Sequence, residues 1–247
     1  MKKVFKTVGD LDKNCYDKYK LTEDILMEHA GASIFNYIKK KFKKNKNILI
    51  VCGAGNNGAD GLVLARLLFG SFNIYLYLSD MMKNQIGKTQ ENRAKAVGVE
   101  IYDQLPSTKD FDIVVDCLFG SGLSRALDEK YINIINFIND TKAYTIACDI
   151  PSGLDNTGLP SPVCVDANVT ITMGGLKLCL YADISKDYVG KVVVANLGVD
   201  RKIYEKNTNY YLLEKKDISL PYRTKSNTNK SNFGHLAVVC GDKQGAA

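Results

Sequence analysis

A glycine-rich segment with three polar side chains is the first candidate for chemistry in this sequence. It reads Gly53-Ala54-Gly55-Asn56-Asn57-Gly58-Ala59-Asp60-Gly61 and follows the apolar run 47–52. Glycine lets a backbone approach a phosphate closely, and the free amide groups at a helix start favour an anion. Many glycine-rich turns are only tight turns, but a plain turn does not need Asn56, Asn57 and Asp60 together. The segment therefore predicts a site for a phosphorylated ligand.

Two further polar segments follow apolar runs in the same way. Asp116 ends the run 111–116 and leads into Cys117-Leu118-Phe119-Gly120-Ser121-Gly122-Leu123-Ser124-Arg125, whose arginine can bind a phosphate through two hydrogen bonds. Asp149 follows the run 143–148 and opens Ile150-Pro151-Ser152-Gly153-Leu154-Asp155. Ligands bind at the carboxyl ends of the strands in an open α/β sheet. We therefore expect the three segments to form one site.

Such a site would bring Asp60, Asp116 and Asp149 to one edge of one sheet. Carboxylates that lie close together repel each other unless a cation or a proton intervenes. Side-chain oxygens of Asn57, Asp116 and Ser152 are suitable ligands for a hard cation. The alternative is that each aspartate only caps the next helix or turn, which is plausible for any one of them and less so for all three. A bound cation is thus a second expectation.

The elements that would position these residues alternate along the chain. Short apolar runs bounded by turn residues are typical of strands covered on both faces, whereas apolar spacings of three and four residues indicate helices. The alternation predicts a Rossmann-like three-layer α/β/α sandwich with a mostly parallel sheet. Helices are expected at 8–19, 22–42, 62–69, 85–97 and 128–139, and strands at 47–52, 74–78, 111–116, 143–148, 169–173 and 191–195.

The predicted organisation is a domain at 1–200, a polar linker at 201–230 and a final piece at 231–247. The linker is rich in asparagine, threonine and lysine, and the apolar run 235–241 would be the first strand of a further unit. One strand cannot bury itself. The last residues therefore indicate the truncated start of a second domain, or else an added strand of the first.

Composition excludes several classes of protein. The net charge of +6 comes largely from lysine, with a cluster at 39–46, but no clustered arginines favour nucleic-acid binding. The seven cysteines include no C-x-x-C pair, so neither a disulfide framework nor a zinc site is expected, and Cys52, Cys117, Cys148 and Cys240 beside apolar runs are expected to be free buried thiols. The start lacks a secretory signal, and no apolar run is long enough to cross a membrane. A cytoplasmic protein is expected.

The three polar segments together resemble those of the YjeF amino-terminal domain, the NAD(P)H-hydrate epimerase family. The likeness rests on the order and spacing of the motifs 55–61, 116–123 and 149–155, and it extends from Leu21 to about Val199. It implies a substrate of hydrated NADH or NADPH and a bound potassium ion held by Asn57, Asp116 and Ser152. The substrate-binding residues that it implies are Asn56, Asn57, Gly58, Ala59, Asp60, Gly120, Ser121, Gly122, Leu123, Ser124, Arg125, Ala126 and Asp149.

The resemblance also implies a reaction, which interconverts the R and S forms at the hydroxyl-bearing C6 of the hydrated nicotinamide ring. Asp149 is predicted to be the catalytic acid or base, with a pKa shifted by nearby acidic groups. The segment 230–241 is similar to the opening of the ADP- or ATP-dependent NAD(P)H-hydrate dehydratase domain. The parent protein would then be bifunctional, with no dehydratase activity expected from this chain. We expect a homodimer with neither nucleic-acid nor membrane partners.

Two positions depart from the family pattern, which has glycine in place of Ala59 and asparagine in place of His29. A requirement for positive φ at residue 59 would disturb the first segment. His29 is interpreted as a residue of the helix face rather than a catalytic group. Two other functions stay open. One is a non-catalytic binding or scaffold module, which would not need the clustered carboxylates, and the other is a dehydrogenase, which would need an acidic ribose ligand that the sequence lacks.

Overall fold

The computed structural model describes residues 1–122, 127–219, 222–235 and 237. The chain forms two compact units, one of residues Lys3–Tyr211 and the other of Met1–Lys2 with Leu212–Ala247. The larger unit runs past residue 200, where the sequence predicts the end of the first domain. The second unit contains the short 3₁₀ helices η2 (Lys215–Asp217) and η3 (Lys230–Phe233). Most of the strand expected at 235–241 lies outside the described residues, so the domain assignment stays a prediction.

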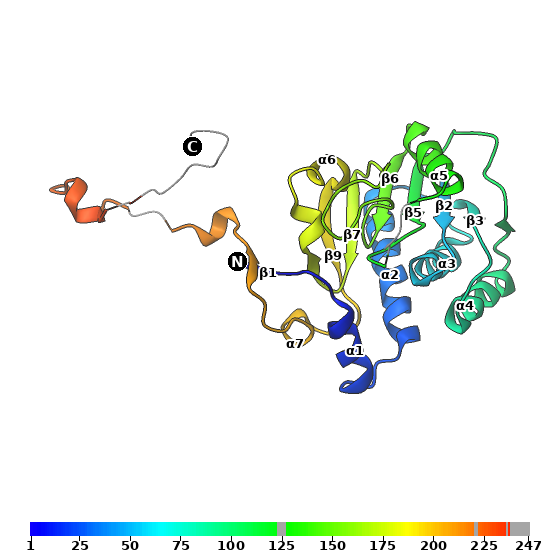
Figure 1. Ribbon diagram of the computed structural model, residues 1–247, viewed down its shortest axis with the longest axis horizontal. Coiled ribbons are helices and arrows are strands. Elements are labelled where there is room, and N and C mark those ends of the chain that lie inside the picture. The colour runs from blue at the N-terminus through cyan, green and yellow to red at the C-terminus, as the bar shows by residue number, and fades with distance from the viewer. Residues whose placement is uncertain (123–126, 220–221, 236, 238–247) are drawn as a thin grey trace. The chain divides into compact units, whose positions relative to one another are not determined.

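A seven-stranded sheet forms the centre of the larger unit, and every neighbouring pair of its strands is parallel (Figure 1). All six predicted strands are present, and the two-residue β4 was too short to be recognised. The order is β4-β3-β2-β5-β6-β7-β9. The strands are β2 (Asn47–Cys52), β3 (Asn73–Leu78), β4 (Ile101–Tyr102), β5 (Ile113–Cys117), β6 (Tyr144–Cys148), β7 (Val169–Met173) and β9 (Lys191–Ala195).

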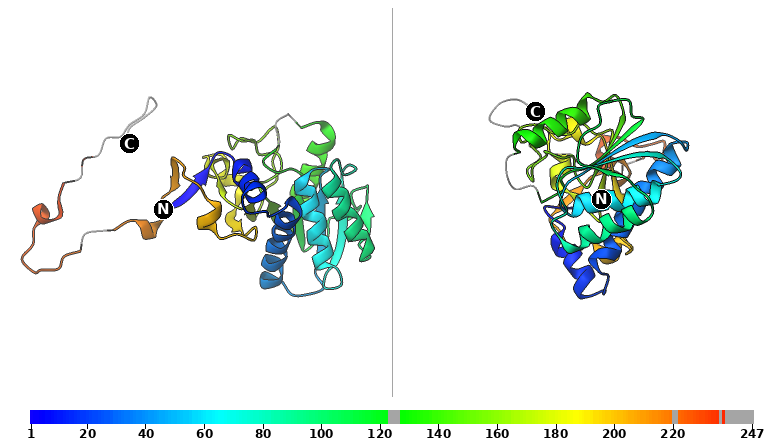
Figure 2. Two further views of the ribbon diagram at one scale, coloured as in Figure 1. Left: turned by 90° about the horizontal axis from the view of Figure 1, so that it is seen from below. Right: turned by 90° about the vertical axis from the view of Figure 1, so that its right-hand side faces the viewer.

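Helices cover both faces of this sheet, which confirms the three-layer sandwich. Side chains alternate along β2, so Ile48, Ile50 and Cys52 join one core while Leu49 and Val51 join the other. The first core contains α1 (Gly9–Asp17), α2 (Glu23–Lys41), α3 (Asn56–Leu68) and α4 (Gln85–Ala96), and the second contains α5 (Glu129–Asp140). The right-hand view of Figure 2 shows the strands fanned between the green α5 and the cyan α3.

Helix α3 begins at Asn56, six residues before the helix expected at 62–69. Most of the glycine-rich segment is therefore the first two turns of a helix rather than a loop. The glycines allow close packing: a Cβ on Gly58 would lie 1.8 Å from the carbonyl oxygen of Gly53, and one on Gly53 would lie 1.9 Å from that of Leu118. Sequence reasoning explained the glycines by phosphate contact or by a tight turn, whereas these two are required by the packing of α3 against the strand ends.

A second, small sheet has the order β10-β1-β8, and most of its residues belong to the larger unit. It was not predicted, because β1 (Lys2–Phe5), β8 (Leu176–Lys177) and β10 (Tyr210–Leu212) are too short to show a pattern. The short helices η1 (Leu178–Tyr181) and α6 (Lys186–Val189) follow β8. Helix α7 (Arg201–Tyr204) lies within the predicted linker, yet Tyr204 is buried in the main core. The first part of the predicted linker is therefore packed structure.

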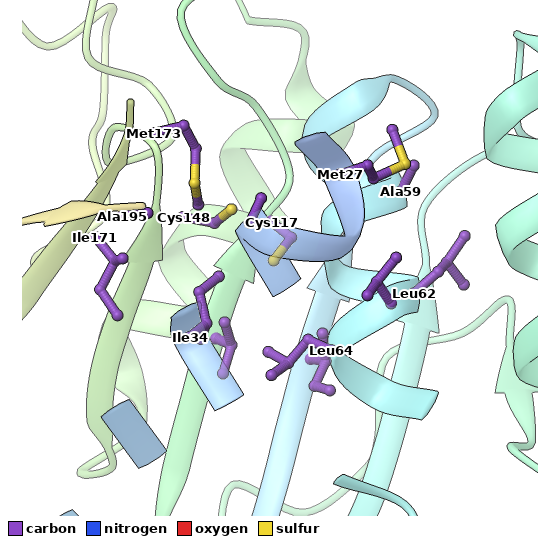
Figure 3. Close-up of a cluster of buried hydrophobic side chains, with 14 of the residues drawn as sticks. Met27, Ile34, Ala59, Leu62, Leu64, Cys117, Cys148, Ile171, Met173 and Ala195 are labelled. Atoms are coloured by element: carbon purple, nitrogen blue, oxygen red, sulfur yellow. The ribbon is translucent and has the colours of Figure 1, made fainter. Parts of the chain in front are cut away.

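The thiols of Cys15, Cys52, Cys117, Cys148, Cys164 and Cys179 are all free and buried, as the sequence predicts for Cys52, Cys117 and Cys148. The predicted Cys240 lies outside the described residues. Figure 3 shows Cys117 and Cys148 in the main core, together with Ala59. Within the part of the chain that the structure describes, no helix has both the length and the apolar character that a membrane span requires.

Candidate active site

A cavity of about 580 Å³ lies at the carboxyl ends of the central strands. The chain leaves β2 toward β3 on one side and continues from β5 toward β6 on the other, so the strand order reverses here. Such a reversal is where open α/β sheets bind their ligands. The cavity is lined by Val8, Asp12, Ala54, Gly55, Asn56, Asn57, Asp60, Lys83, Leu118, Phe119, Gly120, Ser121, Gly122, Tyr131, Asp149 and Met173.

The structure brings seven of the predicted substrate-binding residues to the wall of this cavity, namely Asn56, Asn57, Asp60, Gly120, Ser121, Gly122 and Asp149. Leu123, Ser124, Arg125 and Ala126 lie outside the described residues. Gly58 and Ala59 do not line the cavity. Gly58 packs against the backbone of Gly53, and the fully buried Ala59 belongs to the main core. Their role in substrate binding stays a prediction.

Ala59 is helical and is not among the residues with positive φ, so its side chain causes no backbone strain. The departure from glycine is therefore compatible with the geometry of α3. His29 lies elsewhere, in a surface hollow beside Gly198 and Asn196. It does not line the main cavity, which agrees with its interpretation as a residue of the helix face.

Asp149 is held at the end of β6 in an unusual conformation. Its φ of 71° lies in the left-handed region, which few residues other than glycine adopt. One carboxylate oxygen, Oδ1, accepts hydrogen bonds from Lys177 Nζ at 2.5 Å and from the amide of Met173 at 3.1 Å. The other, Oδ2, accepts from the amide of Ser121 at 3.2 Å. The side chain is thus fixed from three elements and faces the cavity.

The Lys177 ammonium determines the charge of Asp149. Burial by itself would raise the pKa of the carboxyl, but the buried lysine and the two backbone amides hold the pKa of Asp149 below its ordinary value. The sequence-based explanation, a pKa shifted by nearby acidic groups, is wrong in its cause. Asp149 is an ionised carboxylate because a fixed cation lies beside it.

Asp116 has a different environment, beneath the segment 118–120 and away from the cavity wall. It is fully buried, and its carboxylate accepts hydrogen bonds from Ser152 Oγ at 2.6 Å, from the amide of Ser152 at 2.8 Å and from the amide of Leu118 at 3.1 Å. Among the ion pairs formed by the described residues, none includes Asp116. Burial raises the pKa of Asp116 to about 6, although the three donors oppose the rise.

The three predicted cation ligands meet around one carbonyl group. The Phe119 oxygen accepts from Asn57 Nδ2 at 2.9 Å and lies 3.2 Å from Ser152 Oγ, whose single hydroxyl hydrogen is shared between this oxygen and Asp116. A carboxylate, a hydroxyl, an amide and a carbonyl oxygen are thus close together. This donor set suits a hard cation, and a buried carboxylate without a counter-ion favours one. The described residues contain no group of three or more histidine, cysteine or acidic side chains that could hold a metal ion.

Asp60 also faces the cavity, from the second turn of α3. Its recorded side-chain contact is with the Cys148 thiol, at 3.9 Å from Sγ to Oδ2. Burial, followed by the charges of Asp149, Asp12 and Glu23, raises the pKa of Asp60 well above its ordinary value. The pKa values of Asp60 and Asp149 are thus shifted in opposite directions although both line one cavity.

Sequence reasoning missed Lys177, Lys83 and Asp12. Lys177 gave a usable signal, because a lysine inside the apolar stretch 176–180 needs a partner if it is buried, and it is 1% exposed. Lys83 lines the cavity and could pair with a phosphate, but its sequence neighbours show no pattern. Asp12 resembles any acidic residue of a surface helix.

Comparison with known proteins gives relatives along the whole chain. It is 38% identical over 250 residues to the bifunctional NAD(P)H-hydrate repair enzyme Nnr of Helicobacter pylori, a match that covers 100% of this chain and 53% of that protein. It is 34% identical over 180 residues to the NAD(P)H-hydrate epimerase of Limosilactobacillus reuteri, covering 70% of this chain and 84% of that protein. The chain spans about half the length of the bifunctional relatives it matches.

A solved structure and a family model agree with this picture. The crystal structure of yeast ynu0, YNL200c, superposes with a TM-score of 0.67 at 20% identity, covering 78% of this chain and 87% of that one, and so supports the fold. The model of the family described as YjeF-related protein N-terminus matches residues 23–179, which include all three polar segments and Lys177. The chain therefore belongs to the family of YjeF-related protein N-terminal domains.

Proposed function

We propose that this chain is an NAD(P)H-hydrate epimerase, which interconverts the R and S forms of hydrated NADH and NADPH. The observation that carries the proposal is the fixed, ionised Asp149 on the wall of a cavity built from the family's three polar segments. Relatives that match most of this chain carry the names of epimerase and bifunctional repair enzymes, which supports the same reaction.

The cavity offers distinct groups for the two parts of such a substrate. The start of α3 presents free backbone amides, and Lys83 adds a positive charge, so both favour phosphate groups. Asp149 is held by Lys177 in the ionised form that a base requires, and it can take a proton from a water or hydroxyl group at C6. Gly120 lies between Asp149 and Asn57, and its lack of a side chain leaves the Asp149 carboxylate accessible.

A potassium ion is the second part of the proposal. The side chains of Asn57, Asp116 and Ser152 would hold it, and the Phe119 carbonyl is a further oxygen in the same cluster. The ion would supply a positive charge that balances Asp116 and stabilises the segment 118–122. Asp116 and Ser152 do not line the cavity. We therefore assign substrate binding and proton transfer to this chain's own residues on the cavity wall.

Three further expectations extend beyond the described residues. The bifunctional relatives support a parent protein that also has NAD(P)H-hydrate dehydratase activity, a lyase function outside this chain. A homodimer and a cytoplasmic location complete the proposal.

The test uses separated R and S hydrates of NADPH, each mixed with the purified chain, and follows their ratio by chromatography over time. We expect both samples to reach the same ratio far faster than the spontaneous reaction does. A rate equal to that of the spontaneous reaction would contradict the proposal and favour a non-catalytic binding module. Repeating the reaction with tetramethylammonium in place of potassium, at equal ionic strength, tests the ion separately.

A further inference from the structure

A second, smaller cavity of about 100 Å³ adjoins the candidate active site and is open to solvent. Asp12, Asn56, Asp60 and Met173 line both cavities, so these residues form the junction between them. Asp149 lines only the larger one. Asp12 comes from α1, which precedes the segment matched by the family model. An acidic side chain at this junction therefore contacts both the larger cavity and the smaller one, which is open to solvent.

Asp12 is held in place by a residue from the other end of the larger unit. Tyr204 of α7 donates a hydrogen bond from its hydroxyl to Asp12 Oδ1 at 2.7 Å, and Tyr204 is itself buried. Gly174 makes room for this tyrosine, because a Cβ there would lie 2.4 Å from the Tyr204 hydroxyl oxygen. Gly174 has a φ of 69° and follows Met173, whose amide contacts Asp149. Met173 and Gly174, which are neighbours in the chain, therefore help to position Asp149 and the Asp12–Tyr204 pair, respectively.

The charges that face Asp12 come from several elements. Glu23 is on α2, Asp149 is at the end of β6, and Lys177 is on β8. Burial raises the pKa of Asp12, the Tyr204 hydrogen bond and Lys177 oppose the rise, and the two carboxylates add to it. Asp60 of α3 and the Cys15 thiol of α1 lie in the same surroundings, and both respond to the charge of Asp12. The net effect is a raised pKa, so Asp12 keeps its proton to a higher pH than an ordinary aspartate does.

Inversion at one carbon requires proton-transferring groups that reach both faces of the ring, because a hydroxyl leaves from one face and returns on the other. Asp149 is one such group under the proposed function. We propose that Asp12 is the second catalytic residue of the epimerisation, acting from the wall formed by α1, and that Tyr204 is its positioning residue. This inference rests on the proposed function and adds to it a residue outside the family match.

The reaction balances as follows in one direction. The Asp12 carboxyl gives its proton to the C6 hydroxyl, the C6–O bond breaks, and water leaves while the N1 lone pair forms an N1=C6 double bond. A second water attacks C6 from the opposite face, the electron pair returns to N1, and the proton of that water goes to the Asp149 carboxylate. The reverse direction exchanges the two roles. To complete the cycle, Asp149 releases its proton to water in the larger cavity, and Asp12 regains a proton through the smaller cavity, which is open to solvent.

Asp60 is the competing candidate, since it lines both cavities too. Among the described residues, the side-chain donor to Asp60 is the buried Cys148 thiol, and no hydrogen bond orients the Asp60 carboxyl toward the cavity. Asp12 has such a bond, from Tyr204. The geometry therefore favours Asp12.

The test compares Asp12→Asn with Asp17→Asn, a control that removes an exposed carboxylate from the end of the same helix. Asparagine keeps the shape of Asp12 and an oxygen that can accept from Tyr204. For Asp12→Asn we expect kcat to fall by about 100-fold or more, the typical loss of a general acid, with KM changed by about twofold or less. For Asp17→Asn we expect unchanged kinetics. Thermal melting of each variant checks that the fold is retained.

Tyr204→Phe separates positioning from a merely structural role. The lost hydrogen bond stabilised the charged carboxylate, so its removal raises the pKa of Asp12. Activity that depends on protonated Asp12 should then persist to higher pH than in the wild type. In H₂¹⁸O, the enzymatic product should also carry ¹⁸O at C6, because each inversion replaces the hydroxyl oxygen.

The inference is overturned if Asp12→Asn epimerises within about twofold of the wild-type rate, if it raises KM while leaving kcat unchanged, or if the product lacks ¹⁸O. If the pH profile of Tyr204→Phe equals that of the wild type, Tyr204 is not a positioning residue for Asp12. Failure of the proposed function is distinguishable, because in that case the wild-type chain itself would not accelerate the reaction.

Discussion

Asp116 and Asp149 are both buried aspartates at the ends of neighbouring strands, but among the described residues only Asp149 has a cationic partner. Asp149 contacts the buried Lys177 ammonium, whereas Asp116 contacts three uncharged donors. Burial acts in the same direction on both carboxyls. The pKa of Asp149 nevertheless lies below its ordinary value, while that of Asp116 rises to about 6. The difference comes from the presence or absence of a cation fixed by the chain.

This comparison separates the two tasks of the candidate site. Asp149 needs no exchangeable ion and faces the cavity, so it is available to the substrate. Asp116 faces away from the cavity and lies among oxygen atoms, so an external cation would complete its environment. The three aspartates that looked equivalent in the sequence therefore have different roles. The predictions below test this division, from the largest expected effect to the smallest.

Replacing the proposed base should have the largest effect. In Asp149→Asn the side chain can no longer accept a proton, so we expect epimerisation of the R hydrate to slow by about 10²- to 10⁴-fold. Rates of hydrate interconversion and a parallel binding measurement provide the check. A variant that binds the substrate and works at the wild-type rate would rule out a catalytic role for Asp149.

Removing the fixed cation should destabilise the fold. Lys177→Met leaves the Asp149 carboxylate buried without a partner, and breaking such a pair costs about 3–5 kcal/mol. Asp149 has a lowered pKa, so the stability from the pair is present above the ordinary carboxyl pKa and is lost as pH falls through the folded-state pKa. Urea unfolding at pH 7 should show the deficit, and acid should reduce it.

The double variant Lys177→Met with Asp149→Asn is the matched control. It contains no buried charge at this position, so it should recover much of the stability that the single variant loses. If the double variant is as unstable as Lys177→Met, the loss comes from packing rather than from the unpaired carboxylate.

Asp116 should make stability depend on pH in the absence of potassium. Its folded-state pKa is raised, so the folded protein binds a proton more tightly than the unfolded chain does. The free energy of unfolding should therefore fall as pH rises from about 4 to about 6, by at most about 3 kcal/mol. Urea unfolding in tetramethylammonium chloride measures this slope, and potassium chloride at equal ionic strength should flatten it.

Asp116→Asn isolates this contribution from other titrating groups. The variant lacks the ionisable group, so its stability should show neither this slope nor the response to potassium. Identical slopes for the variant and the wild type would show that Asp116 is not the group responsible.

The smallest effect is expected at Ala59, inside α3 and away from both carboxylates. Ala59→Gly restores the residue expected at this position but removes a buried methyl group and adds backbone freedom within a helix. We expect a loss of about 1–2 kcal/mol in stability and an unchanged epimerisation rate. A large gain in rate would mean that the alanine disturbs the site.

The sequence was sufficient to predict the sheet and the residues that meet at its edge. The runs 47–52 and 169–173 match β2 and β7 residue for residue, because strands covered on both faces are rich in apolar and β-branched residues. Asn57, Asp60 and Asp149 were located because they follow such runs. The start of α3 was placed six residues too late, since glycine and asparagine are poor helix formers and only the packing against Gly53 and Leu118 explains their position.

The residues that close the site could not be predicted, because they depend on contacts between distant parts of the chain. Asp12 and Tyr204 meet across 192 positions, and the pairing of β1 with β8 brings together residues 4 and 176. Neither β1 nor β8 is long enough to show an alternating pattern. The pairing of Lys177 with Asp149 is another such contact, and it determines the charge of the proposed base.

The most direct test of the division between the two aspartates is an anomalous difference map from crystals grown with rubidium in place of potassium. The account predicts one strong peak among the oxygen atoms of Asn57, Asp116, Ser152 and Phe119, and none beside Asp149, where Lys177 already provides the positive charge. A peak at Asp149, or no peak at Asp116 in crystals of the active protein, would contradict it.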